Sequence, residues 1–365
     1  MMRNKKITII AFCLFAMPAV AFANSGTPLV IATIFHLILG NALIGLLEGV
    51  LLARIFKLPM IKTLLLLVLA NYFSAWIGGL FINTVLHYFP LDINSAWQFL
   101  WIMTAVTYFI TLILEFPFVC LTFREAHNPK WLKNSILGNL LVQTISYVLL
   151  FVWYWSASGI SLYTQTDVVK LSEIKLPGNV QIYFISDNDG NVYMMNPGET
   201  MPHKIFELKS QEKNDRLFIR KSPSDGNKWD LIDTAKLINV KEAFTADAVP
   251  SWQYNREKEP DTWRNFGSAA RLGSAQNSKW DFWSGFWPVE GLRGKQSGTG
   301  RPAGFSFETP FAAWVVRNVT LLPDDKVLLQ LGDNQICIFD PDKKQIALIA
   351  KGRGPTAIIK SDGHK

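Results

Sequence analysis

The chain has 365 residues, of which 49% are apolar and 18% are charged, so it is neither intrinsically disordered nor an ordinary soluble protein. Apolar residues are concentrated in the first 157 positions. The formal net charge is +7, but from position 158 onward 27 Lys or Arg face 25 Asp or Glu. That balance excludes the basic surface that nucleic-acid binding requires, so no nucleic-acid partner is expected.

Residues 1–23 have the three parts of a secretory signal peptide. The positive start MMRNKK precedes the short apolar run ITIIAFCLFAMPAV, and Ala21-Phe22-Ala23 supplies the small-x-small pattern that signal peptidase accepts. The sequence therefore predicts cleavage before Asn24. An uncleaved anchor helix is the alternative interpretation.

Four long apolar runs follow the signal peptide. Each has about 20 residues or more, which at a rise of about 1.5 Å per residue suffices to cross about 30 Å of hydrocarbon. We expect a four-helix transmembrane domain over residues 24–157, with spans at about 29–53, 63–83, 99–123 and 135–155.

The short loops predict how these helices are oriented. Loops 54–62 and 124–134 each carry three Lys or Arg, whereas loop 84–98 carries none. Positive loops stay in the cytoplasm, so the chain is expected in the cytoplasmic (inner) membrane with the lipid bilayer as partner. The mature N-terminus and everything after about position 158 then lie on the periplasmic or extracellular side.

Polar residues within the apolar runs fall on one face of each helix when they are placed at 100° per residue. In hydrocarbon these groups need partners, so the four polar faces are expected to converge. The intramembrane site candidates are Glu48, Glu115, Asn41, Asn71, Asn139 and Gln143.

Two interpretations of this polar seam stay open. In the first, small residues such as Gly45 and Gly49 allow close helix contact, and the amides bond across helices. In the second, the glutamates form a proton, cation or partner site, because an ionised carboxylate at depth costs at least about 2.5 kcal/mol. Glu48 has the further option of reaching Arg54 or Lys57 at the inner surface.

The segment 158–365 changes to strand-like alternation, and we expect an extracytoplasmic, antiparallel β-rich domain. Hairpins or meanders are predicted at 180–196, 216–232 and 326–352, around turns such as Asn-Asp-Gly. The last of these resembles the strand–turn–strand pattern of β-propeller blades. The fold class is thus an α+β membrane protein whose exported domain is a sandwich or partly propeller-like. Residues 352–355, Gly-Arg-Gly-Pro, are expected to form a loop.

A Trp-rich excursion occupies residues 250–310. Its aromatic side chains are expected to bury against the sheet or dip into the bilayer interface, or else to form a platform for a glycan or peptide. The candidates for this extracytoplasmic aromatic patch are Trp252, Trp263, Trp280, Trp283 and Trp287.

No nucleophile elbow, Walker loop, zinc-protease motif or paired-cysteine motif is present, so no catalytic residue, metal or cofactor is predicted. The leading hypothesis is a non-enzymatic envelope protein whose exported domain binds or senses a protein or glycan. The alternative is a small transporter, or a transporter subunit, with an intramembrane carboxylate site at Glu48 and Glu115. An intramembrane enzyme that uses those carboxylates is a third, weaker reading.

Overall fold

The computed structural model describes most of the chain in eleven stretches, which are residues 39–86, 91–126, 129–156, 161–178, 180–213, 215–221, 228–233, 239–245, 267–272, 278–285 and 291–359. These fall into two compact units. A helical unit precedes Ser161, and a β unit contains most residues from Ser161 onward. The predicted signal peptide and Trp252, Trp263 and Trp287 lie outside the described residues.

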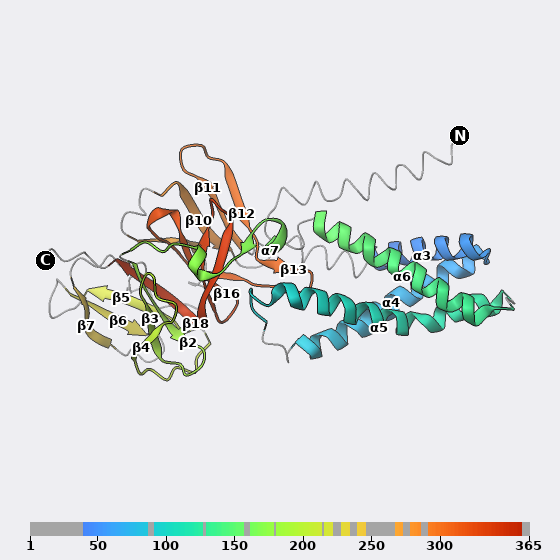
Figure 1. Ribbon diagram of the computed structural model, residues 1–365, viewed down its shortest axis with the longest axis horizontal. Coiled ribbons are helices and arrows are strands. Elements are labelled where there is room, and N and C mark those ends of the chain that lie inside the picture. Colours follow the sequence, from blue (N-terminus) through green and yellow to red (C-terminus); the bar gives the residue numbers. More distant parts are fainter. Residues whose placement is uncertain are drawn as a thin grey trace. The chain divides into compact units, whose positions relative to one another are not determined.

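Five helices are described rather than the four that the sequence predicted (Figure 1). Three of them are long and apolar enough to cross a membrane, and they confirm helices at 63–83, 99–123 and 135–155. The additional helix is a single turn in the β unit. The helices are α3 (Asn41–Phe56), α4 (Met60–Leu86), α5 (Ala96–Glu125), α6 (Trp131–Ser156) and α7 (Ser161–Thr164).

Helix α3 falls on the first predicted span, and 16 of its residues are described. The predicted beginning of that span, at 29–38, lies outside the described residues. The helix ends three residues later than expected. Its end is set at Lys57, which adopts the left-handed conformation (φ 57°) and donates its backbone N–H to the carbonyl of Ala53.

Glycines hold α3 and α4 in backbone contact. A Cβ atom added to Gly45 would lie 2.6 Å from the Cα atom of Val68, and one added to Gly49 would lie 2.9 Å from the Cα atom of Leu64. Only glycine fits at such a crossing. The predicted close contact through Gly45 and Gly49 is therefore confirmed.

The polar and apolar sides of the helices separate as predicted. In α3 the buried face includes Asn41, Gly45 and Glu48, whereas large apolar side chains on the helices point outward. Phe109 and Ile113 of α5 are examples, with 61% and 71% of their surface exposed. An exposed apolar exterior around a polar interior is the arrangement that a bilayer stabilises.

The β unit is dominated by a nine-stranded sheet in the order β4-β3-β2-β18-β17-β16-β15-β9, with β1 pairing beside β18. Most neighbours are antiparallel, as predicted, but β1 with β18 and β15 with β9 are parallel. The strands are β1 (Asp167–Val168), β2 (Val180–Ser186), β3 (Val192–Met195), β4 (His203–Phe206), β9 (Ala270–Arg271), β15 (Val316–Leu321), β16 (Val327–Leu331), β17 (Gln335–Asp340) and β18 (Gln345–Ile359).

Three smaller sheets accompany it, in the orders β5-β6-β7, β12-β11-β10-β8 and β13-β14. Two short 3-10 helices complete the described elements, at Leu171–Glu173 and Pro323–Asp325. The remaining strands are β5 (Leu217–Lys221), β6 (Lys228–Asp233), β7 (Asn239–Thr245), β8 (Gly267–Ser268), β10 (Trp280–Gly285), β11 (Gly291–Gln296), β12 (Pro302–Phe305), β13 (Glu308–Thr309) and β14 (Ala312–Ala313).

All three predicted hairpins or meanders are confirmed. Strands β2 and β3 pair across the Asn-Asp-Gly turn, where Gly190 has a φ of +68°. β5 pairs antiparallel with β6, and β16, β17 and β18 form the predicted meander. The turn chemistry of these segments was therefore sufficient to place the strands.

The prediction of a loop at residues 352–355 is wrong, because this segment lies inside the 15-residue strand β18. The first part of β18 pairs with β17 and its later part pairs with β2. The change of partner falls between Lys351 and Gly352, and a register shift between Arg353 and Thr356 then interrupts the pairing with β2. Gly354 stands there with a φ of +57°, and a Cβ atom would lie 2.3 Å from the Cα atom of Arg216, so the glycine permits a bulge rather than a loop.

Strand β2 carries apolar side chains into two separate cores. Ile182 and Phe184 belong to a large cluster with residues of β16, β17 and β18, whereas Tyr183 and Ile185 pack with Leu217 of β5. Because successive side chains point to opposite faces of a strand, β2 is covered on both sides. This explains why its sequence reads as a nearly continuous apolar run.

Candidate functional site: a paired-carboxylate cavity in the helical unit

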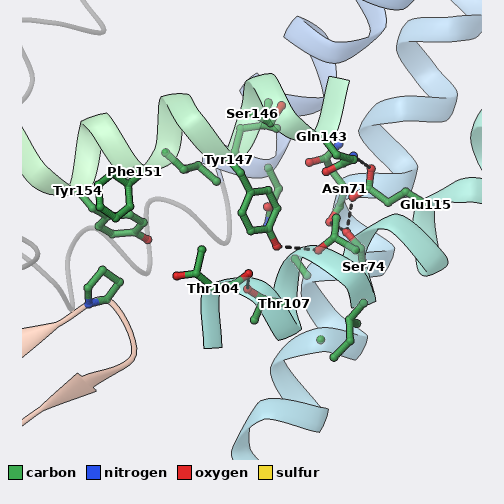
Figure 2. Close-up of a pocket in the computed structure, with 18 of the residues that line it drawn as sticks. Asn71, Ser74, Thr104, Thr107, Glu115, Gln143, Ser146, Tyr147, Phe151 and Tyr154 are labelled. Carbon is green, nitrogen blue, oxygen red and sulfur yellow. Dashed lines mark hydrogen bonds between the residues drawn. The ribbon is translucent and has the colours of Figure 1, made fainter. Parts of the chain in front are cut away.

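A cavity of about 300 Å³ lies among the helices, and α3, α4, α5 and α6 all contribute to its lining (Figure 2). Each helix packs against the next, and α3 also packs against α6, which closes the ring of helices. The predicted polar stripes of the four helices converge here. Both glutamates that the sequence predicted within membrane spans, Glu48 and Glu115, belong to the lining.

Glu48 of α3 is completely buried and accepts a hydrogen bond on each carboxylate oxygen. The amide nitrogen of Asn71 on α4 lies 2.7 Å from Oε2, and the hydroxyl of Ser146 on α6 lies 2.6 Å from Oε1. The sequence left open a pairing of Glu48 with Arg54 or Lys57. The structure joins it to neutral donors instead.

Glu115 of α5 is also completely buried and is bonded in the same way. The amide nitrogen of Gln143 on α6 lies 2.6 Å from Oε2, and the hydroxyl of Ser74 on α4 lies 2.5 Å from Oε1 (Figure 2). The four carboxylate oxygens thus have four separate donors. Both carboxyl groups are therefore fully satisfied by protein donors and have no accessible surface of their own.

The two halves of this network have the same design. Helices α3–α4 and α5–α6 are two hairpins, and each has a glutamate on its first helix and an amide-x-x-Ser pair on its second, Asn71/Ser74 and Gln143/Ser146. Each glutamate takes its amide from its own hairpin and its serine from the other hairpin. The two hairpins thus contribute the same kinds of group to one network.

This choice of partners suits both charge states of a carboxyl group. An amide NH₂ only donates, so it holds the oxygen that remains an acceptor. A serine hydroxyl either donates or accepts, so it can donate to a carboxylate and accept from the O–H of a protonated acid. The network therefore permits a glutamate to gain or lose a proton without leaving a buried group unsatisfied.

The cavity extends from the glutamates in one direction only. Its lining continues along α6 from Gln143 to Tyr154, which is about 16 Å at 1.5 Å per residue. On the other side of the glutamates lies an apolar cluster that includes Leu52, Leu67 and Phe123. The carboxylates thus form the floor of a blind cavity.

Two of the predicted site residues, Asn41 and Asn139, do not bond to either carboxylate. Asn41 lines the cavity about two turns from Glu48, and it is not one of the four side chains that donate to the two carboxylates. Asn139 is buried and donates its amide N–H to the carbonyl of Leu112, at 2.9 Å. It joins α6 to α5 as a structural clamp.

The list of candidates drawn from the sequence omitted two direct partners of the carboxylates, Ser74 and Ser146. Both lie one turn from a predicted amide on the same polar stripe, and that periodicity was the signal. Tyr147, Phe151 and Tyr154, which line the far part of the cavity, were also missed, because aromatic residues near the end of a span are expected at a membrane interface.

No family model matches the chain, and neither a curated protein nor a solved structure matches it. What the protein does must therefore be argued from the chemistry of its own residues. Among the residues that the structure describes, no group of three or more His, Cys, Asp or Glu could hold a metal ion.

The aromatic candidates of the β unit that are described, Trp280 and Trp283, lie on β10. Trp280 stacks on Phe282 at 5.3 Å between ring centroids. Trp283 is 39% exposed, and the guanidinium of Arg293 lies 5.9 Å from its ring centroid. Arg271 pairs with Asp281 nearby, at 2.9 Å. In the described residues the predicted aromatic patch thus consists of the exposed ring of Trp283 beside the guanidinium of Arg293.

Proposed function

We propose that this chain is a multi-pass inner-membrane protein of the transporter or transporter-subunit class, whose helical unit binds a small cation, including the proton, at Glu48 and Glu115. The observation that carries this proposal is that the two carboxylates form the floor of a cavity. Had the polar stripes only joined the helices, a seam packed without space would have been enough.

The site is built for positive charge. Two carboxylates with neutral donors attract cations, and among the described lining residues there is no Lys, Arg or His to neutralise them. A polar or ionisable group at membrane depth is expensive and commonly marks an ion or substrate path. In transporters built from repeats, such sites lie where the repeats meet.

The basic loops support an orientation for the cavity. Arg54 and Lys57 follow the end of α3 near the apolar cluster, and positive loops stay in the cytoplasm. In the proposed topology α3 is the first of four spans, the blind end of the cavity faces the cytoplasm, and the β unit is extracytoplasmic. A cation would then enter from the extracytoplasmic side.

Substitution of each glutamate by glutamine tests the proposal. Glutamine fits both positions, because its oxygen can accept from the amide and its NH₂ can donate to the serine hydroxyl. We expect Glu48→Gln and Glu115→Gln to fold normally and to weaken cation binding at least about tenfold, the effect of losing a charged partner. The measurement is isothermal titration calorimetry of the full chain in lipid nanodiscs, with Na⁺, Ca²⁺ and tetramethylammonium as probes.

The exposed Glu173 of the β unit provides the matched control, and Glu173→Gln should bind every probe as the unsubstituted chain does. Proton release into a weakly buffered solution is followed in the same titrations. If neither glutamate substitution changes binding or proton release in a folded protein, the carboxylate network is structural and the proposal is wrong.

A second candidate function rests on the β unit, where Trp283 and Arg293 support the binding of an extracytoplasmic protein or glycan. Binding of soluble peptidoglycan fragments and of lysozyme-derived glycans to the full chain, compared with Trp283→Ala, would test it. Equal binding by the unsubstituted chain and by Trp283→Ala would show that the aromatic patch does not bind the glycan.

A further inference from the structure

The aromatic wall of the cavity restricts the kind of cation that fits. Tyr147, Phe151 and Tyr154 follow one another along α6 at spacings of four and three residues, which places them on one face of the helix. All three line the cavity between the carboxylates and the end of α6 (Figure 2). One wall of the cavity is therefore aromatic while its floor carries two carboxyl groups.

We infer that the ligand is a small organic cation, an ammonium group carried on an apolar body. This inference rests on the proposed function and adds the chemical class of the ligand. The ammonium group lies at the floor of the cavity beside Glu48 and Glu115, where the charge of these groups attracts it. Their partners Asn71 and Ser74, which keep 6% and 7% of their surface exposed, contact it. The apolar body lies along the aromatic wall.

The wall distinguishes organic from inorganic cations. A metal ion such as Na⁺ or Ca²⁺ is held by several oxygens at short distance, and aromatic rings supply none. An alkylammonium group is attracted to the face of an aromatic ring, and its carbon atoms gain from leaving water. Three rings along one wall thus favour an organic cation over a hydrated metal ion.

The size and polarity of the cavity agree with this class. A volume of about 300 Å³ lies at the lower end of the range for small-molecule sites, so a small organic cation fits. Apart from the carboxylates, the polar lining is largely hydroxyl. Thr104 and Thr107 already donate their hydroxyl hydrogens to backbone carbonyls, each at 2.7 Å, and so present their oxygens as acceptors. Acceptors without competing cations suit an N–H or N–CH₃ donor.

The experiment compares probes that differ in charge and in apolar body. Calorimetric titrations of the full chain in nanodiscs use n-butylamine and tetramethylammonium as organic cations, 1-butanol as the neutral counterpart of butylamine, and Na⁺ and Ca²⁺ as inorganic cations. We expect the organic cations to bind at least about tenfold more tightly than 1-butanol and the inorganic cations. Glu48→Gln and Glu115→Gln should each weaken them at least about tenfold.

The aromatic wall is tested by Phe151→Leu, which keeps an apolar side chain but removes the ring, including its stacking on Trp101 at 5.4 Å between ring centroids. We expect the affinity for the organic cations to fall by about 3- to 30-fold, the range of a cation–π contact, while the weak signal of inorganic cations does not change. Phe109→Leu is the matched control, because Phe109 is exposed on the outer face of α5. It should bind all probes like the unsubstituted chain, and helix content and thermal unfolding of both variants establish that they fold.

The outcomes separate the two proposals. Glutamate-dependent binding of Na⁺, Ca²⁺ or protons without binding of either amine overturns the ligand class and leaves the proposed function standing. Equal binding of n-butylamine and 1-butanol also overturns the class, because charge would then not be recognised. If no probe binds in a glutamate-dependent way, both proposals are wrong.

Discussion

Each buried glutamate has one partner that only donates and one that can change its role. Ser146 and Ser74 have hydroxyls that turn from donor to acceptor, whereas Asn71 and Gln143 fix the opposite oxygen. A carboxylate held by two amides would be stable in one charge state only. At the scale of single residues, the serines are thus the part of the network that permits proton exchange.

A different carboxylate, Asp340 in the β unit, is built to stay charged. Its side chain is 3% exposed, and Lys326 Nζ lies 2.7 Å from Oδ2. Burial by itself would raise the pKa of this carboxyl, but the hydrogen bond from Lys326 and the backbone N–H groups of Lys343 and Asp342 outweigh burial. The pKa of Asp340 therefore lies below its ordinary value.

We predict that Asp340→Asn lowers the free energy of unfolding of the β17–β18 region by about 2 kcal/mol at pH 7, because a charged hydrogen bond is lost and Lys326 loses its partner. A depressed pKa contributes stability above the unfolded-state pKa of about 4, and the contribution is lost as the pH falls through the folded-state value. The unsubstituted protein should therefore lose local stability more steeply than the variant below about pH 4.

Hydrogen exchange of β17 and β18 peptides, measured by mass spectrometry on the full chain, checks both parts of this prediction. Asp324→Asn is the matched control, since Asp324 is exposed and its change should stay within about 0.5 kcal/mol. Equal acid sensitivity of the unsubstituted protein and Asp340→Asn would contradict the assigned role.

At the scale of elements, the contact of α3 with α4 determines whether Glu48 reaches Asn71. Gly45 and Gly49 lie on the same face as Glu48, and they allow the two backbones to touch. Wider side chains would separate the helices and lengthen the 2.7 Å bond between Glu48 and Asn71. The glycine contact between α3 and α4 is therefore required for the hydrogen bond between Glu48 and Asn71 at the carboxylate site.

We predict that Gly45→Ala destabilises the helical unit by about 1–2 kcal/mol. The added methyl group overlaps the backbone of α4, which costs about 1–3 kcal/mol and exceeds the gain of up to about 1 kcal/mol in helix propensity. Thermal unfolding in detergent, followed by circular dichroism at 222 nm, measures the change.

Gly78→Ala is the matched control, because a Cβ atom there meets nothing within 4 Å. That variant should be neutral or more stable by up to about 1 kcal/mol. Equal stability of the Gly45→Ala and Gly78→Ala proteins would show that the close approach of α3 and α4 contributes little.

Sequence periodicity was enough to predict the helices and the β-hairpins, but it did not predict the contacts between one hairpin and another. Polar stripes at 100° per residue placed Glu48, Asn71, Glu115 and Gln143 on inner faces. They could not show that each glutamate takes its serine from the other hairpin, because that depends on tertiary contacts. Likewise, two glycines and a proline at 352–355 resembled a loop, and only pairing with two different strands makes β18 continuous there.

At the scale of the whole molecule, the separation into an apolar helical unit and a β unit follows directly from composition. Helices α4, α5 and α6 meet the length and apolarity that a span requires. The side of the membrane on which the β unit lies is a separate proposal, which the basic loops and the predicted signal peptide support.

We predict that a single cysteine placed in the β unit at Lys204 reacts with a membrane-impermeant maleimide in intact cells, whereas one at Lys130 reacts only after the membrane is broken. Cys13, Cys120 and Cys337 are first replaced by Ala, so that the introduced cysteine is the single one in the chain. Lys204 is exposed and Lys130 lies in the basic loop between α5 and α6, so both thiols are accessible on their own side. Labelling of position 130 in intact cells would invert the proposed topology.

Strand β18 makes the order of synthesis matter for the β unit. The ribosome completes β2, β3 and β4 long before β18, yet β2 has its second neighbour only when β18 arrives. Until then one edge of β2 exposes unpaired backbone groups and an apolar surface that invites wrong pairing. If the β unit is exported as proposed, this incomplete sheet is exposed in the envelope until the rest of the chain has been translocated. A periplasmic chaperone that covers the free edge of β2 would prevent wrong pairing during that time.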